Sequence, residues 1–223
     1  YHSSPCENQL LGAQIVKEVY GRPVFPVDIP HLNGTREIEY VVAQLKEEIK
    51  FLEEHTGRNF CWERFKTICE ESNNMTDKIL EWNQLRRAFP SPQSGKMASL
   101  MLVILQVFSG TELGTWIISE LAADAKDKIA RGESVVPSKD EIRAVWYVNP
   151  IYFDLSIYDW MENELGLVVC QDLFGYMATE PYIDTSTQES MLKGLAYKLM
   201  NSVPMVRQGK GDYGPWIEDW MQM

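Results

Sequence analysis

The stretch Ile142-Arg-Ala-Val-Trp-Tyr-Val148-Asn-Pro150 decides the fold, because it begins an alternation of strand and helix in the second half of the chain. Residues 142–148 are mainly apolar and stop at an Asn-Pro break, which predicts a buried strand. Residues 153–165 predict a helix ended by Gly166, and residues 167–170, Leu-Val-Val-Cys, predict a second buried strand. A strand, helix, strand order implies a parallel sheet. The residues after position 132 therefore predict a doubly wound lobe.

The beginning of the chain predicts the same alternation. Apolar residues recur at helical spacing within residues 7–20, and Gly21 supplies a C-terminal cap. The proline-bounded stretch 23–30 is rich in β-branched and aromatic residues, so we expect a short strand that ends at Asp28. This part of the chain is typical of one step of a second parallel sheet.

Between these two parts, the pattern predicts helices without strands. Four amphipathic segments, at residues 36–55, 61–87, 96–108 and 113–131, are separated by Gly- and Pro-containing breaks and form a predicted four-helix module. The predicted fold class is therefore α/β. It consists of parts of two doubly wound (Rossmann/flavodoxin-like) parallel-sheet lobes, residues 1–35 and 133–223, joined by an all-helical segment, residues 36–132.

Composition excludes several classes of protein. The 223 residues are 45% hydrophobic and 24% charged, as in globular proteins, and the net charge of −11 argues against nucleic-acid binding. The pair Arg86-Arg87 is interpreted as a solvated helix end. The longest apolar run, residues 97–108, is too short for a membrane span, which needs about 20 residues.

No secretory signal peptide is visible within residues 1–223, and the four cysteines match neither a disulfide framework nor a zinc-site spacing. A reducing cytoplasm is therefore the expected location. The chain starts without a Met and stops inside a predicted helix, so we expect it to be a piece of a longer protein.

Cys6 is the cysteine best placed for chemistry, because it stands at the start of the first predicted helix. A helix N-terminus stabilises a thiolate, which is the form that attacks substrates and binds soft metals. Free cysteines are also commonly buried for packing, so the residues alone leave both interpretations open. For Cys61, Cys69 and Cys170 a structural role is the favoured interpretation.

Ligands of doubly wound sheets collect beyond the carboxyl ends of the strands. In this chain those ends are predicted near His31, Asn149 and Gln171. His31 is a candidate for substrate contact, with an exposed loop residue as the open alternative. No phosphate-binding loop, nucleophile elbow or metalloprotease motif is present in the sequence.

Three segments together resemble the 2-hydroxyacyl-CoA dehydratase family, which includes benzoyl-CoA reductase and double-cubane-cluster subunits. They are Ser3-Ser-Pro-Cys-Glu-Asn8, Tyr20-Gly-Arg-Pro-Val-Phe-Pro-Val-Asp-Ile-Pro30, and the helix end Leu52-Glu-Glu-His-Thr-Gly57. The later segments Val145-Trp-Tyr-Val-Asn-Pro150 and Gly166-Leu-Val-Val-Cys-Gln-Asp172 also fit the family's second lobe.

The resemblance implies a 4Fe–4S cluster held by three cysteines from separate segments, with Cys6 as one ligand and the others outside residues 1–223. It implies radical elimination of water from an acyl-CoA thioester, or ATP-driven reduction of one, in an oxygen-sensitive enzyme. It also implies a homologous second subunit, which gives a heterodimer, and an ATP-dependent iron–sulfur activator protein. The candidate substrate contacts are Ser4, Asn8, His31, Asn149 and Tyr152.

One departure leaves the subtype open. Where the family sometimes has a cysteine shortly after the second-lobe aspartate, this chain has Asp172-Leu-Phe-Gly-Tyr176. A double-cubane-cluster reductase relative is therefore an alternative. A non-catalytic two-lobed scaffold or small-molecule-binding subunit is the alternative from a different functional class.

Overall fold

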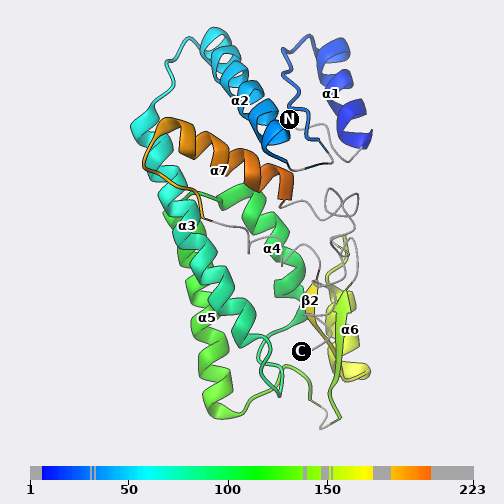
Figure 1. Cartoon of the computed structure of the whole chain (residues 1–223). Coiled ribbons are helices and arrows are strands. Elements are labelled where there is room, and N and C mark those ends of the chain that lie inside the picture. The colour runs from blue at the N-terminus through cyan, green and yellow to red at the C-terminus, as the bar shows by residue number, and fades with distance from the viewer. Residues whose placement is uncertain are drawn as a thin grey trace. The chain divides into compact units, whose positions relative to one another are not determined.

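The computed structural model describes residues 7–30, 32, 34–137, 140–146, 151, 153–172 and 182–201, with the backbone alone for residues 7–9. The elements in chain order are α1, α2, α3, α4, α5, β1, α6, β2 and α7 (Figure 1). The predicted α/β class is confirmed. The described residues hold one two-stranded sheet, so the two doubly wound lobes stay a prediction.

The chain divides into two compact units. One contains residues 1–67 and 181–213, and the other contains residues 68–180 and 214–223. Helix α3, Trp62–Leu85, therefore contributes residues to both units. These units are divided at other positions than the expected lobe boundaries, residues 35 and 132. The lobe boundaries stay predictions.

In the first unit, α1 (Glu7–Tyr20) forms as the sequence predicts, and Gly21 adopts the left-handed conformation with φ 59°. The expected strand near Asp28 is wrong, because Val27 makes only an isolated bridge. The side chain of Gln44 takes the place of a neighbouring strand: its Oε1 accepts from the Asp28 N–H at 2.7 Å, and its Nε2 donates to the Asp28 carbonyl at 2.8 Å. Prolines at 23, 26 and 30 lack the N–H groups that a longer ladder needs.

The core of this unit lies between α2 (Thr35–Thr56) and α7 (Gln188–Asn201), which lie side by side (Figure 1). Helix α2 ends as predicted at Gly57, which has φ 66°. The shared core contains apolar residues at helical spacing from both helices: Val41, Val42, Leu45, Leu192, Ala196 and Met200. Helix α2 therefore packs on α7, and the four-helix module expected at residues 36–132 stays a prediction.

The second unit contains the rest of α3 with α4 (Gly95–Phe108) and α5 (Glu112–Arg131). Ser94 and Thr111 cap the N-termini of α4 and α5 by accepting from backbone N–H groups. The three helices share one core, made of Met75, Ile79, Trp82, Met101, Ile118, Ala122 and Ala125.

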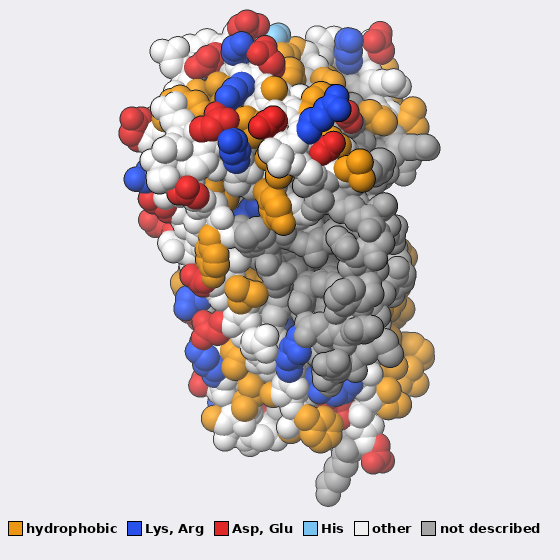
Figure 2. Space-filling view, in the orientation of Figure 1, with side chains coloured by type: hydrophobic (Ala, Val, Ile, Leu, Met, Phe, Trp, Pro, Cys, Tyr) orange, Lys and Arg blue, Asp and Glu red, His pale blue; other side chains and the backbone are white. Residues whose placement is uncertain are grey.

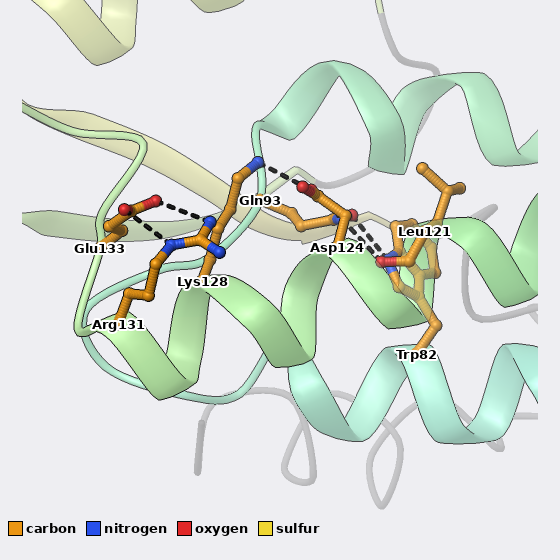
Figure 3. A network of polar contacts seen from close by, with 7 residues as sticks. All are labelled: Trp82, Gln93, Leu121, Asp124, Lys128, Arg131 and Glu133. Atoms are coloured by element: carbon orange, nitrogen blue, oxygen red, sulfur yellow. Dashed lines mark hydrogen bonds and ion pairs between the residues drawn. The ribbon is translucent and has the colours of Figure 1, made fainter.

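Gln93, from the loop between α3 and α4, connects these helices through buried hydrogen bonds. Its Oε1 accepts from Trp82 Nε1 at 2.6 Å, and its Nε2 donates to the Leu121 carbonyl at 2.8 Å and to Asp124 Oδ2 at 3.0 Å (Figure 3). Lys128 extends the network by pairing with Asp124 at 2.7 Å. Gln93 thus satisfies the buried indole N–H of Trp82 and connects α3 to α5.

Strands β1 (Ile142–Trp146) and β2 (Leu167–Asp172) pair in parallel, and α6 (Ser156–Glu164) connects them. The predicted parallel pairing is confirmed. One side of β2 packs Val169 with Tyr158 and Met161 of α6, and the other packs Val168 and Cys170. Because β2 is covered on both sides, its sequence lacks the alternation of apolar and polar residues that is typical of a half-exposed strand. Among the helices that the structure describes, none combines the length and hydropathy needed to cross a membrane.

Candidate functional site

The carboxyl end of the parallel sheet is the place where this fold class binds ligands. Trp146 of β1 and Asp172 of β2 pair at that end. The register shifts just before it: Ala144 pairs with Val169 and Val145 with Gln171, which leaves Cys170 as the extra residue of a β-bulge. Bulges change the direction of the side chains beyond them and are frequent beside active sites.

A buried polar cluster lies next to this bulge. Arg86, just past the end of α3, donates from Nη1 to Gln171 Oε1 at 2.8 Å and from Nη2 to the Val169 carbonyl at 3.5 Å. Gln171 Nε2 donates to Asn83 Oδ1 at 3.3 Å. Arg86, Gln171, Asn83 and Asp172 are all less than 5% exposed. The end of α3 thereby fixes the last residues of β2 before the sheet edge.

Burial lowers the pKa of Arg86 to about 10, while the carboxylate of Asp172 and the thiol of Cys170 act in the opposite direction. A pKa of about 10 keeps the guanidinium charged at neutral pH. The cation also lies 4.4 Å from the ring centroid of Trp82, a cation–π contact. The carboxyl end of β2 is therefore a fixed, charged site in which Arg86 offsets the buried carboxylate of Asp172.

Sequence reasoning missed this cluster. It interpreted Arg86 as part of a solvated helix end, but Arg86 is 2% exposed. The available signal was the helical spacing, because Arg86 continues the buried stripe of Met75, Ile79 and Trp82. An arginine on an apolar stripe indicates a buried partner.

A second polar group surrounds the N-terminus of α4. The Glu162 carboxylate of α6 accepts from the Gly95 N–H and from Ser94 Oγ, both at 2.8 Å. Burial raises the pKa of Glu162, against the effect of these two donors. Ser99 of α4 donates to the Tyr158 hydroxyl at 2.5 Å, and burial raises the pKa of Tyr158. These contacts attach α4 to α6.

The described cysteines have no arrangement suited to holding a metal. Cys170 is buried at the bulge, accepts from Arg143 Nε at 3.1 Å and lies 3.5 Å from Ser91 Oγ. Cys69 is buried within α3, whereas Cys61 is exposed. Among the described residues, no group of three His, Cys, Asp or Glu side chains could hold a metal ion.

The structure does not describe the side chains of the predicted site residues. Cys6, Ser4, His31, Asn149 and Tyr152 lie outside the described residues, and Asn8 is described only as backbone within α1. The predicted ligand and substrate contacts therefore stay predictions. The described part of α1 covers Glu7–Tyr20, which follow Cys6 in the sequence.

Comparison with known proteins identifies the family. The family model described as "2-hydroxyglutaryl-CoA dehydratase, D-component" matches residues 2–223. No curated protein gives a significant match. The match covers both compact units and includes the parallel strands with the buried cluster at their carboxyl end. The chain therefore belongs to the 2-hydroxyglutaryl-CoA dehydratase D-component family.

Proposed function

We propose that this chain acts as the iron–sulfur subunit of a cytoplasmic 2-hydroxyacyl-CoA dehydratase-type enzyme, which eliminates water from a 2-hydroxyacyl-CoA thioester. The observation that carries the proposal is the family match over residues 2–223. The predicted doubly wound lobes, the homologous second subunit and the ATP-dependent activator protein belong to the same proposal.

Cys6 is the proposed ligand of a 4Fe–4S cluster. The position of Cys6 at the start of the helix that the sequence predicts for residues 7–20 supports this role, because the free N–H groups of a first helical turn stabilise an adjacent thiolate. The buried positions of Cys69 and Cys170 argue against their use as ligands. The remaining ligands would come from segments outside residues 1–223. When bound, the cluster supplies single electrons to the thioester substrate.

The residues of the chain would position the substrate. Arg86 and Gln171 fix the carboxyl end of β2, and the candidate contacts Asn149 and Tyr152 come after β1 in the sequence. Ser4, Asn8 and His31 are the proposed contacts from the first part of the chain. In this arrangement Arg86 acts through Gln171 and Asp172, so it is a positioning residue.

The test is anoxic purification of the chain in its full-length context, together with the homologous second subunit, and then iron and sulfide assays. The wild-type protein should be brown and contain both elements, and Cys6→Ala should lose most of them. Cys61→Ala is the matched control, because Cys61 is an exposed cysteine at the start of another helix. A colourless wild-type protein after anoxic cluster reconstitution would contradict the proposal.

A further inference from the structure

The first unit contains a cavity that the proposed function does not use. Its volume is about 380 Å³, within the range of about 300–1,000 Å³ typical of small-molecule sites. It lies between the N-terminal half of α2 and one face of α7, and residues 182–184 form its third wall. Its lining residues are Thr35, Ile38, Glu39, Tyr182, Asp184, Ser190, Lys193, Gly194 and Tyr197.

The walls of this cavity are held by packing. Gly194 allows the third wall to approach α7, because a Cβ at Gly194 would lie 2.9 Å from Ile183 Cγ2 and 3.1 Å from Ile183 Cα. Ile183 itself is buried. Beyond the cavity, Lys46 of α2 pairs with Glu189 of α7 at 2.7 Å. The cavity is therefore formed in the folded chain without a ligand.

Two of its polar residues are engaged in local structure. Asp184 Oδ1 accepts from the Ser186 N–H at 2.9 Å, and this bond lowers the pKa of Asp184. Ser190 Oγ donates to the Asp184 carbonyl at 2.9 Å and accepts from the Thr187 N–H at 3.0 Å. These contacts cap the start of α7 and leave little capacity for a ligand.

Glu39 and Lys193 differ from these residues. Neither side chain makes a hydrogen bond or ion pair within the part of the chain that the structure describes, although Lys193 helps to lower the pKa of Glu189. The two residues come from different walls, α2 and α7. Tyr182 is 53% exposed and Tyr197 is half-buried, so aromatic surface is available beside both charges. Beside the engaged Asp184, the cavity thus offers the carboxylate of Glu39, the ammonium of Lys193 and two aromatic rings.

We infer that this cavity binds a small zwitterion with an aromatic side chain, of the amino-acid class. Glu39 receives the ammonium group, Lys193 receives the carboxylate, and the rings of Tyr182 and Tyr197 contact the side chain. The carboxylates of Glu39 and Asp184 disfavour a polyanion such as a nucleotide. The site does not involve Cys6, so the inference goes beyond the proposed function.

The affinity should be weak, because Glu39 and Lys193 are exposed to water. For a ligand of about 12 non-hydrogen atoms, we expect a Kd on the order of 1 mM. Ligand-observed NMR suits this range. The probe is L-phenylalanine, titrated against the full chain, with 3-phenylpropanoate and phenethylamine as analogues that lack the ammonium and the carboxylate, respectively.

We expect saturable binding of L-phenylalanine and about tenfold weaker binding of each analogue, because each loses one charge-assisted hydrogen bond. Lys193→Met should abolish the preference for L-phenylalanine over phenethylamine, and Glu39→Gln should abolish the preference over 3-phenylpropanoate. Lys198→Met and Glu54→Gln, which change charges outside the cavity on the same two helices, should change neither preference.

Absence of saturable L-phenylalanine binding would overturn the inference, as would analogues that bind as tightly as L-phenylalanine. Binding that Lys193→Met and Glu39→Gln leave unchanged would also overturn it. The iron content of the enzyme tests the proposed function through Cys6 and is independent of these measurements.

Discussion

Arg86 Nη1 lies 2.8 Å from Gln171 Oε1, so a guanidinium at the end of α3 is fixed to the last residues of β2 across 85 positions of sequence. The same guanidinium contacts the ring of Trp82 and lies near Asp172. These contacts join the helical core of the second unit to its sheet. The charge of Arg86 also offsets part of the cost of burying the Asp172 carboxylate.

Arg86→Met should lower the free energy of unfolding by about 3–5 kcal/mol, because it removes the buried cation that interacts with the Asp172 carboxylate and with Gln171. Urea unfolding monitored by tryptophan fluorescence measures this change. Arg87→Met is the matched control, since Arg87 is only half-buried, and its effect should be smaller. Adding Asp172→Asn to Arg86→Met should restore part of the loss. Equal effects of the two arginine substitutions would contradict the role assigned to Arg86.

Gly95→Ala should destabilise the protein by about 1–3 kcal/mol, because a Cβ there would lie 2.8 Å from Val169 Cβ and 3.0 Å from Tyr158 Cδ1. Gly12→Ala provides the control. Gly12 is also helical, and a Cβ there meets nothing within 4 Å, so this change should stabilise by about 0.5–1 kcal/mol. Thermal unfolding of both variants shows whether steric clash or helix propensity determines the stability change at Gly95. A stabilised Gly95→Ala protein would show that α4 can move away from β2.

Gln93→Leu should cost about 1–3 kcal/mol, because the N–H of Trp82 and the carbonyl of Leu121 lose their buried partner. The comparison is Gln84→Leu, an exposed position at the end of α3, where we expect a change within about 0.5 kcal/mol. Denaturant unfolding gives both values. If the two substitutions had the same effect, the network of Figure 3 would contribute nothing to stability.

Local sequence signals predicted the helices and the parallel strands well, because apolar spacing and terminal glycines such as Gly57 and Gly132 act within a few residues. They failed where a distant side chain determines the outcome. Gln44 replaces a strand partner for Asp28, and Arg86 is buried by residues of β2. Leu11, Ile15 and Val19 have helical spacing but are more than half exposed. The periodicity of a segment therefore indicated its conformation but not which element covers it.

Charge patterning said less about the structure than apolar spacing did, because the partners of a charged residue are often distant in sequence. On the face shown in Figure 2, Lys and Arg side chains are interspersed with Asp and Glu, as the absence of a basic run in the sequence suggests. The candidate chemistry, in contrast, rested on Cys6 and further positions whose side chains the structure does not describe. Their roles depend on residues far away in sequence, which short motifs do not specify.

Glu162 should make stability depend on pH in a defined direction. Burial raises its pKa above the ordinary value of 4.5, so the folded protein holds this proton more tightly than the unfolded chain does. The stability that Glu162 contributes is therefore complete below about pH 4.5 and is lost as the pH rises through the raised pKa. Glu162→Gln keeps an oxygen that can accept from Ser94 and Gly95 but removes the charge.

The difference in free energy of unfolding between Glu162→Gln and the wild type should consequently shift in favour of the variant between about pH 4 and pH 7. Urea unfolding at both pH values measures it. Glu164→Gln, an exposed position on the same helix, corrects for the general effect of removing one negative charge. If the wild type instead gains stability relative to Glu162→Gln on going to neutral pH, the two donors at the start of α4 outweigh burial. The ionised carboxylate would then be the form that holds α6 against α4.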